Sequence, residues 1–296
     1  MTVANVTTMN STAEIQRPSD DERDMFGLTH PGRVRKDNQD HFLICTVHPQ
    51  VSVDATSLPN VDQLPLRGSR IATVLLVADG VGGSDSGSDA ARLAAESIAK
   101  YASSTLRSYH TAGSANEDLL LKSLEDAVMQ AHDVVRAEGA SRAEPKPMAT
   151  TLTMCLGVWP WMYVVQVGDS RCYYYDSAEL HQVTQDQTVG QYLVDTGALP
   201  KDRLAASPFH SVLSSAIGGN EATPKVTRID RRRSGTVLLC SDGLTRHVTN
   251  DELAEHMRTA TSAEQLCRAL VDLALERGGK DNITVVVLRA PKRISD

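Results

Sequence analysis

The sequence has few cysteines, and none of them has the spacing of a zinc site. The five lie at positions 45, 155, 172, 240 and 267, with no Cys-x-x-Cys pair among them. Most are embedded in apolar runs, where a cysteine packs as a small hydrophobic side chain. The odd number and these settings predict reduced thiols and argue against a disulfide framework or a zinc cluster.

Long hydrophobic runs and a surplus of positive charge are missing as well. No apolar run approaches the ~20 residues that cross a bilayer, and the N-terminus lacks the basic start and apolar core of a secretion signal. The formal net charge of −7 gives no general attraction to nucleic acid or to an anionic membrane. We therefore expect a cytoplasmic protein that binds neither nucleic acid nor a membrane.

The sequence does contain an aspartate at the start or end of five strand-like apolar runs: Asp40, Asp79, Asp169, Asp242 and Asp281. In an antiparallel sheet, the end of one strand lies beside the start of its neighbour, so all five carboxylates can meet at one edge. Two carboxylates ~5 Å apart repel by roughly 3 kcal/mol at an effective dielectric constant near 20. The pattern therefore predicts bound cations, and oxygen ligands without His or Cys favour Mg²⁺ or Mn²⁺.

Glycines follow the second of these aspartates, in the segment Asp79-Gly80-Val81-Gly82-Gly83. A backbone without Cβ allows close approach to a ligand, so the Gly80 carbonyl can coordinate a metal beside the Asp79 carboxylate. A plain strand-to-helix turn is the alternative. A nucleotide-binding loop is excluded, because neither Gly-x-x-x-x-Gly-Lys-Ser/Thr nor Gly-x-Gly-x-x-Gly occurs.

The first half of the chain predicts strands followed by helices. Strands are expected at 41–47 and 71–78, on either side of a loop insertion at 48–70. A helix with Ser88 as its N-cap follows, and then a second helix that ends at Gly139.

The second half predicts strand pairs, an irregular flap at about 187–225 and two capped helices. The strand pairs are TLTMCLGV with MYVVQVG and RCYYYD with ELHQVT. The helices begin with capping boxes, Thr249 with Glu252 and Ser262 with Gln265. Many strands, helices in adjacent pairs and no repeating βαβ order indicate an α+β layered sandwich with largely antiparallel pairing.

These motifs, in this order, resemble the metal-dependent serine/threonine protein phosphatases of type 2C, and the Asp-Gly-Val-Gly-Gly form is most similar to bacterial members. The resemblance implies a four-layer α-β-β-α sandwich with two central, largely antiparallel sheets. It also implies a phosphatase domain at 24–291 that includes the flap, between a flexible tail at 1–23 and a short tail at 292–296. The matching segments are GRVRKDNQD (32–40), ADGVGG (78–83), ATTL (149–152), VGDSR (167–171), TQD (184–186), SDGL (241–244) and DNITVVV (281–287).

The resemblance assigns the aspartates unequal roles at two Mn²⁺ or Mg²⁺ ions. The central ligands would be Asp79, Asp242 and Asp281 with the Gly80 carbonyl, Asp40 would support them, and Asp169 would share a third, weaker metal with Asp242.

Arg35 aligns with the family's phosphate-binding arginine, since a planar guanidinium can bind two phosphate oxygens at once. Arg33, expected two residues away on the same strand face, is the alternative, and a surface ion pair is the ordinary explanation for either.

The implied reaction is direct hydrolysis, in which a metal-bridging hydroxide attacks the phosphorus of phosphoserine or phosphothreonine without a phosphoenzyme intermediate. The expected partners are phosphorylated proteins and a serine/threonine protein kinase, and we expect a monomer. The alternative is a phosphoprotein-binding relative that has kept the fold but has little or no catalysis. The five intact aspartates argue against it.

Two positions depart from the family, and one motif points to another class of phosphatase. Val81 replaces a histidine assigned as the general acid in many eukaryotic members, and Gln39 replaces a glutamate, which removes one supporting negative charge. Cys240 and Arg246 have the Cys-x5-Arg spacing of cysteine-dependent phosphatases. We reject that chemistry because Asp242 would place a negative charge inside the phosphate loop.

Overall fold

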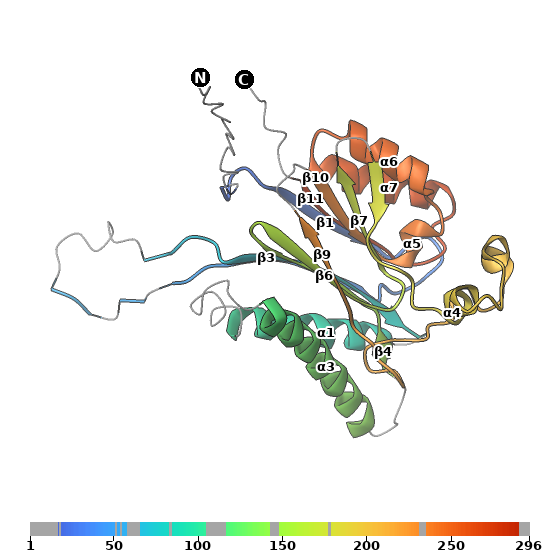
Figure 1. The fold of residues 1–296 in the computed structure, drawn as a ribbon, viewed down its shortest axis with the longest axis horizontal. Coiled ribbons are helices and arrows are strands. Elements are labelled where there is room, and N and C mark those ends of the chain that lie inside the picture. Colours follow the sequence, from blue (N-terminus) through green and yellow to red (C-terminus); the bar gives the residue numbers. More distant parts are fainter. Residues whose placement is uncertain are drawn as a thin grey trace, which may run out of the picture.

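Two antiparallel β-sheets face each other at the centre of the molecule, and helices cover the outer face of each sheet (Figure 1). These four layers confirm the predicted α-β-β-α sandwich. The computed structural model describes residues 17, 19–50, 52–53, 55–57, 66–82, 85–104, 117–142, 148–176, 179–230 and 235–289.

Every strand pairing among the described residues is antiparallel. The pairs β5–β6 and β7–β8 are the two predicted strand pairs. The first sheet has the order β1 (Asp24–His30), β11 (Ile283–Arg289), β10 (Gly235–Cys240), β7 (Arg171–Asp176) and β8 (Glu179–Gln182). The second has the order β2 (Asp40–Val47), β3 (Ala72–Val81), β5 (Leu152–Val158), β6 (Trp161–Val167) and β9 (Lys225–Asp230), with β4 (Ala149–Thr150) beside β3.

Helices are placed in pairs on the two outer faces. The short helix α5 (Asp242–Thr245) follows β10, and the flap contains α4 (Val189–Asp195) and the 3₁₀ helix η2 (Lys201–Ala206). The second sheet is covered by α1 (Asp85–Ser104) and α3 (Glu117–Ser141), and the first by α6 (Asn250–Thr259) and α7 (Ala263–Glu276).

Alternation along the strands divides the hydrophobic core into layers. In β10, Val237 and Leu239 pack between the sheets in one cluster with Val77 of β3. The alternate residues, Leu238 and Cys240, pack against the helices over the first sheet. Because β10 is buried on both faces, the residues that follow it leave the sheet from a fixed point.

Two predicted helix boundaries were wrong. The first helix begins at Asp85, so Ser88 lies inside it and is not its N-cap; its hydroxyl instead lies 3.3 Å from His41 Nε2 of β2. The second helix continues past Gly139 to Ser141. Gly139 is buried there and keeps a helical backbone, so it does not act as a left-handed stop.

Three strands were missed in the sequence: the two-residue β4 and the longer β9 and β1. β9 is an edge strand whose residues are mostly exposed, and most of them are charged or polar, so the apolar–polar alternation that predicts a strand is weak. β1 is partly exposed along its whole length and contains Gly27, where a Cβ would lie 2.4 Å from the Phe42 ring. The Phe42 ring packs directly against the Gly27 backbone, and a glycine inside a strand weakens the strand signal.

The predicted capping boxes differ in their contacts. Thr249 and Glu252 make both hydrogen bonds of the box at the start of α6. At the start of α7, Ser262 Oγ accepts from the backbone N–H of Gln265, but Gln265 Oε1 accepts from Thr261 instead of Ser262. The second box is therefore only half formed.

The loop insertion at 48–70 lies partly outside the described residues, and so do most of the predicted tails at 1–23 and 292–296. At the base of the insertion, Gln50 and Arg67 form an isolated antiparallel bridge. Over the described ranges, no helix is long and apolar enough to cross a membrane.

Replacing Thr249 by Ala tests the capping box. The variant loses the side-chain acceptor for the Glu252 N–H, and we expect it to lower the free energy of unfolding by about 1 kcal/mol in urea titrations. Thr259→Ala is the matched control, because that hydroxyl only donates to the Glu255 carbonyl near the end of the same helix. Equal losses in the two variants would contradict the assignment.

Candidate metal centre

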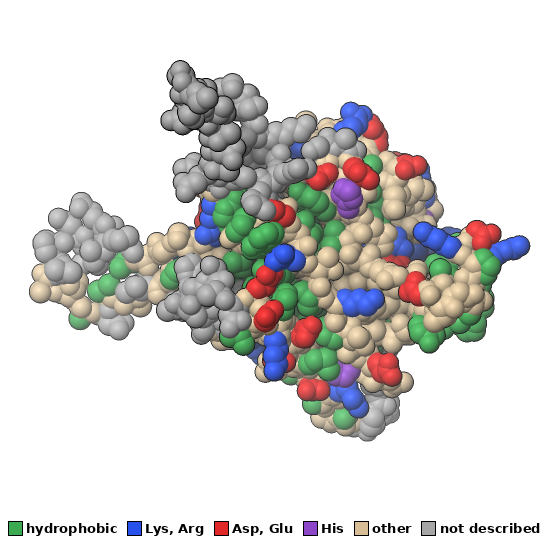
Figure 2. All heavy atoms as spheres, in the orientation of Figure 1, with side chains coloured by type: hydrophobic (Ala, Val, Ile, Leu, Met, Phe, Trp, Pro, Cys, Tyr) green, Lys and Arg blue, Asp and Glu red, His purple; other side chains and the backbone are tan. Residues whose placement is uncertain are grey.

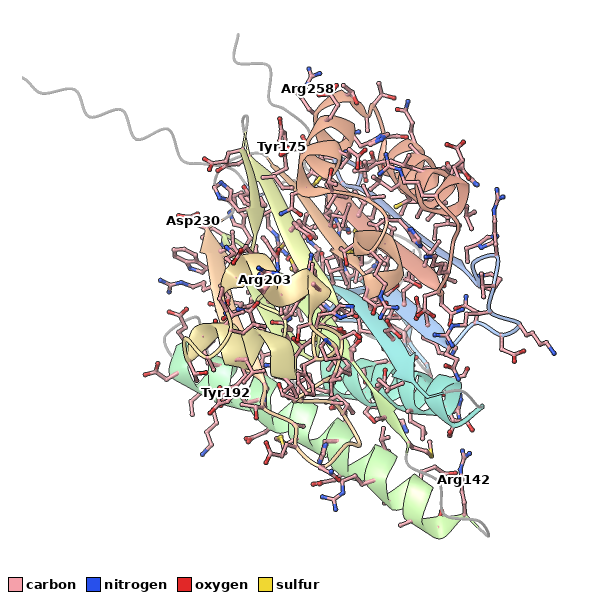
Figure 3. All side chains as sticks on the ribbon, turned by 90° about the vertical axis from the view of Figure 1, so that its right-hand side faces the viewer. Arg142, Tyr175, Tyr192, Arg203, Asp230 and Arg258 are labelled. Atoms are coloured by element: carbon pink, nitrogen blue, oxygen red, sulfur yellow. The ribbon has the colours of Figure 1, made fainter. Side chains whose placement is uncertain are left out.

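The five aspartates gather at the end of the two sheets where α5 and the flap lie, the end that faces the viewer in Figure 3. The register of β2 with β3 sets Asp40 opposite Asp79. From the other sheet, Asp242 starts α5 directly after β10, and Asp281 lies two residues before β11. Asp169 lies in the turn between β6 and β7. The sequence prediction of a shared edge is confirmed.

Asp40 is buried and links the two sheets. Its Oδ2 accepts hydrogen bonds from Ser241 Oγ and Thr284 Oγ1, both at 2.7 Å. Among the described residues no group donates to its buried Oδ1, and the Asp79 carboxyl could do so only if it were protonated. Burial raises the pKa of Asp40 to about 6, although the two hydroxyl donors oppose the rise. An unpaired, buried carboxylate oxygen is suited to a cation.

Asp79 lies at the centre of the negative charge. Its backbone is held by Thr150 and Thr151: Thr150 Oγ1 donates to the Asp79 carbonyl at 2.9 Å, and the Asp79 N–H donates to Thr151 Oγ1 at 3.1 Å. Burial raises the pKa of Asp79 well above its ordinary value. The four other carboxylates raise it further: Asp40, Asp242, Asp169 and Asp281.

Glycines allow the backbone to pack tightly around the cluster. A Cβ on Gly80 would lie 2.4 Å from the Gly87 carbonyl oxygen and 2.8 Å from that of Gln39. Gly168 has a φ of +102°, and a Cβ there would lie 2.7 Å from Thr151 Cγ2. Both positions therefore require glycine for steric reasons.

Two arginines hold the outer carboxylates. Arg35 makes a two-point ion pair with Asp281: its Nε donates to Oδ1 at 2.8 Å, and its Nη2 donates to Oδ2 at 3.0 Å. Arg246 reaches Asp281 Oδ2 through Nη1 at 3.2 Å and also pairs with Asp242 Oδ2. The hydrogen bonds and charge of Asp281 raise the pKa of Arg35.

Arg33 does not share a strand face with Arg35, which corrects the sequence prediction. Residues 31–39 form the loop between β1 and β2, where no strand is present. Within that loop the Arg33 N–H donates to the Gly279 carbonyl at 2.7 Å. Of these two arginines, only Arg35 pairs with a carboxylate of the cluster among the described contacts.

Asp169 lies beside Asp242 at the edge of the cluster. Burial raises its pKa to about 7, the carboxylates of Asp242 and Asp186 add to the rise, and the guanidinium of Arg246 opposes it. Asp186 itself is held by Arg171 in a two-point ion pair, at 2.8 and 2.6 Å.

The flap is attached to the cluster at both of its ends. Near its start, the Gln187 N–H donates to the Gly168 carbonyl at 3.0 Å, and Gln187 Oε1 accepts from the Gly168 N–H at 2.9 Å. Near its end, Ile217 pairs with Thr150, which is bonded to Asp79. The flap therefore borders the carboxylates and is not a detached loop.

Sequence analysis missed the part that Arg246 plays here. It was considered only as the arginine of the Cys-x5-Arg spacing. The signal that could have found it is its position four residues after Asp242, because residues i and i+4 lie on the same side of a helix. Ser241 and Thr284, the partners of Asp40, gave no signal beyond their place beside strand ends.

The residues fit a hard divalent cation. The cluster consists of buried oxygen ligands, several with pKa values raised by burial and by one another. Within the described ranges, no three carboxylate, imidazole or thiol groups already enclose an ion, and Asp242 and Asp281 are paired with guanidiniums instead. The ligand roles of the individual aspartates remain predictions.

Cys240 is unsuited to nucleophilic catalysis. It is completely buried at the end of β10, and burial raises the pKa of its thiol to about 12. Arg246, the arginine of the Cys-x5-Arg spacing, is paired with Asp242 and Asp281, so it is not positioned to bind a phosphate next to the thiol.

We therefore expect iodoacetamide to leave Cys240 unmodified in the native protein at pH 8, where a thiol with this raised pKa stays protonated. Cys45, which is only partly buried, should react first. Peptide mapping by mass spectrometry measures both rates, and unfolding in guanidinium should make them similar. Equal labelling of the two cysteines in the native state would refute the assignment.

Comparison with known proteins places the chain among phosphatases. A family model described as protein phosphatase 2C matches residues 51–277. The serine/threonine protein phosphatase PstP of Mycobacterium tuberculosis is 35% identical over 216 residues, which cover 73% of this chain but only 40% of that relative.

Solved structures agree with the sequence matches. The M. tuberculosis PstP/Ppp structure is 27% identical with a TM-score of 0.71, and the match covers 90% of this chain and 98% of that one. A PstP catalytic domain in complex with two manganese ions is 26% identical with a TM-score of 0.69, covering 90% and 97%. With more than half of its length matched by the family model, the chain belongs to the protein phosphatase 2C family.

Proposed function

We propose that this chain hydrolyses phosphoserine and phosphothreonine on proteins with the help of two Mn²⁺ or Mg²⁺ ions. The observation that carries the proposal is the carboxylate cluster, in which Asp79 lies among four other acids and Asp40 Oδ1 receives no hydrogen bond from the residues that the structure describes. The two manganese ions in the related PstP catalytic domain support it. PstP is named a serine/threonine protein phosphatase, which supports the choice of substrate class.

The proposed ligands are the residues that the resemblance singled out. Asp79, Asp242, Asp281 and the Gly80 carbonyl would hold the two ions, and Asp40, oriented by Ser241 and Thr284, would support them. When bound, the ions supply an activated water and neutralise charge on the phosphoryl group. The ends of β3, β10 and β11 hold the backbones of the aspartates in place, so only side chains have to move when the ions bind, as Arg35 and Arg246 release their carboxylates.

Arg35 is the proposed phosphate ligand. Its guanidinium is half exposed and lies at the edge of the cluster, where it binds the two oxygens of Asp281. A phosphate offers the same pair of acceptors, so the guanidinium can bind substrate in the geometry it already uses. Val81 lies exposed beside the cluster and has no titratable group, so it cannot supply the proton that the leaving oxygen needs.

The flap is the proposed recognition surface for the phosphoprotein. It carries three large hydrophobic side chains that are exposed, Tyr192, Phe209 and Val212. Figure 2 shows hydrophobic and charged side chains together on this part of the surface, at its right. Exposed apolar groups beside a phosphate site can bind the polypeptide that carries the phosphate.

We further propose that residues 24–291 form one phosphatase domain between two tails and that the chain acts as a monomer in the cytoplasm. The five cysteines are all free thiols, which suits a reducing compartment. A serine/threonine protein kinase, or the proteins that it phosphorylates, would be the natural partner.

A phosphoprotein-binding relative with weak catalysis is the second candidate. Its support comes from Val81 and from the guanidiniums that hold Asp242 and Asp281. The presence of all five acids and of the Arg35 fork favours the enzyme.

Asp79→Asn should be the most damaging change among the five aspartates. We expect kcat/KM for Mn²⁺-dependent hydrolysis of p-nitrophenyl phosphate to fall by more than about 100-fold, and Asp40→Asn to cost roughly 10- to 100-fold as a supporting residue. Asp133→Asn, an exposed position on α3, is the control and should leave the rate unchanged. A wild-type chain that binds phosphopeptides but hydrolyses no p-nitrophenyl phosphate, with Mn²⁺ or after EDTA treatment, would establish the binding relative instead.

Arg35→Ala and Arg33→Ala form a matched pair for the phosphate ligand. Losing a charge-assisted fork should lower kcat/KM of the Arg35 variant by roughly 10- to 100-fold, mainly through KM. The Arg33 variant should stay within about threefold of wild type, because no contact with the cluster is lost. Steady-state kinetics with a phosphopeptide distinguishes them, and a larger effect at Arg33 would reverse the assignment.

A further inference from the structure

Arg246 joins two of the carboxylates in the cluster. It is the C-cap of α5, one helical turn after Asp242, and its backbone N–H donates to the Asp242 carbonyl at 2.9 Å. From this position the guanidinium pairs with Asp242 Oδ2 and donates through Nη1 to Asp281 Oδ2 at 3.2 Å. The Arg246 side chain is 42% exposed, whereas the two carboxylates are 17% and 19% exposed. The positively charged Arg246 side chain therefore reaches the cluster from its solvent-exposed side.

Both partners of Arg246 are among the proposed metal ligands. An oxygen held by a guanidinium has to be released before it can coordinate an ion, and arginine cannot lose its proton to release it. The released side chain cannot move far, because the hydrogen bonds of α5 fix the backbone of Arg246 one turn from Asp242. Its charge therefore stays within one side-chain length of the cluster.

Asp169 lies within the field of the same guanidinium. Arg246 pairs with Oδ2 of Asp242, and the charges of Asp242 and Arg246 both act on the Asp169 carboxyl. The third, weaker metal expected from the sequence would be shared by Asp169 and Asp242. A permanent positive charge there neutralises part of the attraction and repels a divalent ion.

We propose that Arg246 is a tethered cation of this metal centre, which competes with the metals for Asp242 and Asp281 and takes the place of the third ion. The inference rests on the proposed function, because it requires that these aspartates bind two ions. Arg246 acts through the carboxylates that it contacts, so it is a positioning residue. The result is a site that binds two metal ions and does not bind a third.

Mn²⁺ binding to the full chain tests this, with affinities from isothermal titration calorimetry and the number of bound ions from native mass spectrometry. Arg246→Gln removes the charge, Arg246→Lys keeps it, and Arg246→Asp adds a carboxylate. Arg258→Gln is the matched control, since this exposed arginine pairs with Glu255 on α6, in the helical layer at the top of Figure 3. Circular dichroism checks that each variant is folded.

We expect the wild-type chain to bind two ions. The Gln variant should also bind two, about two- to fivefold more tightly, since an exposed ion pair contributes modestly to the competition. The Lys variant and Arg258→Gln should remain close to wild type. The Asp variant should bind a third, weaker ion.

Three ions bound to the wild-type chain would overturn the inference and leave the proposed function intact. Equal affinities and equal numbers of ions in the wild type and in the Gln and Asp variants would do the same. A wild-type chain that binds no Mn²⁺ and shows no metal-dependent turnover would overturn the proposed function, and the inference with it.

Discussion

Repulsion among carboxylates that the fold brings together is the constraint on which the rest of this molecule depends. Asp40 and Asp79 face each other across β2 and β3, and burial raises the pKa of both. Such a group of acids is stable only with compensating positive charge, and protein atoms supply part of it through Arg35 and Arg246. The protein thus contains a site whose own electrostatics favour a divalent cation.

The layered core makes this unfavourable arrangement possible. Strands buried on both faces, such as β10 and β11, give their ends fixed positions, and the three hydrophobic clusters on and between the sheets provide the stability. Hydroxyl groups then connect the sheets at the site, as when Ser241 and Thr284 of the first sheet donate to Asp40 of the second. Stability from the core therefore offsets the strain of the charged edge, as is common at functional sites.

Much of this could be predicted from the sequence, and the errors have physical causes. Aspartates beside buried apolar runs were identified because strand ends are marked by a sharp change from apolar to polar residues. β9 was missed because none of its residues is fully buried, and Ser88 was wrongly assigned as the N-cap because α1 begins three residues earlier, at Asp85. Local patterns do not report which face of an element is covered by another.

The sequence alone determined the class of fold, the acids at the strand ends and the motif order of the family. Only the tertiary structure decided which arginine reaches which acid. Arg33 and Arg35 are two residues apart, yet a loop bonded to Gly279 leaves only Arg35 on Asp281. Arg246 joins Asp242 to Asp281 because the turn of α5 and the start of β11 meet in space. Side-chain charge is a property of the chain, but the distances that give it effect exist only after the two sheets have packed.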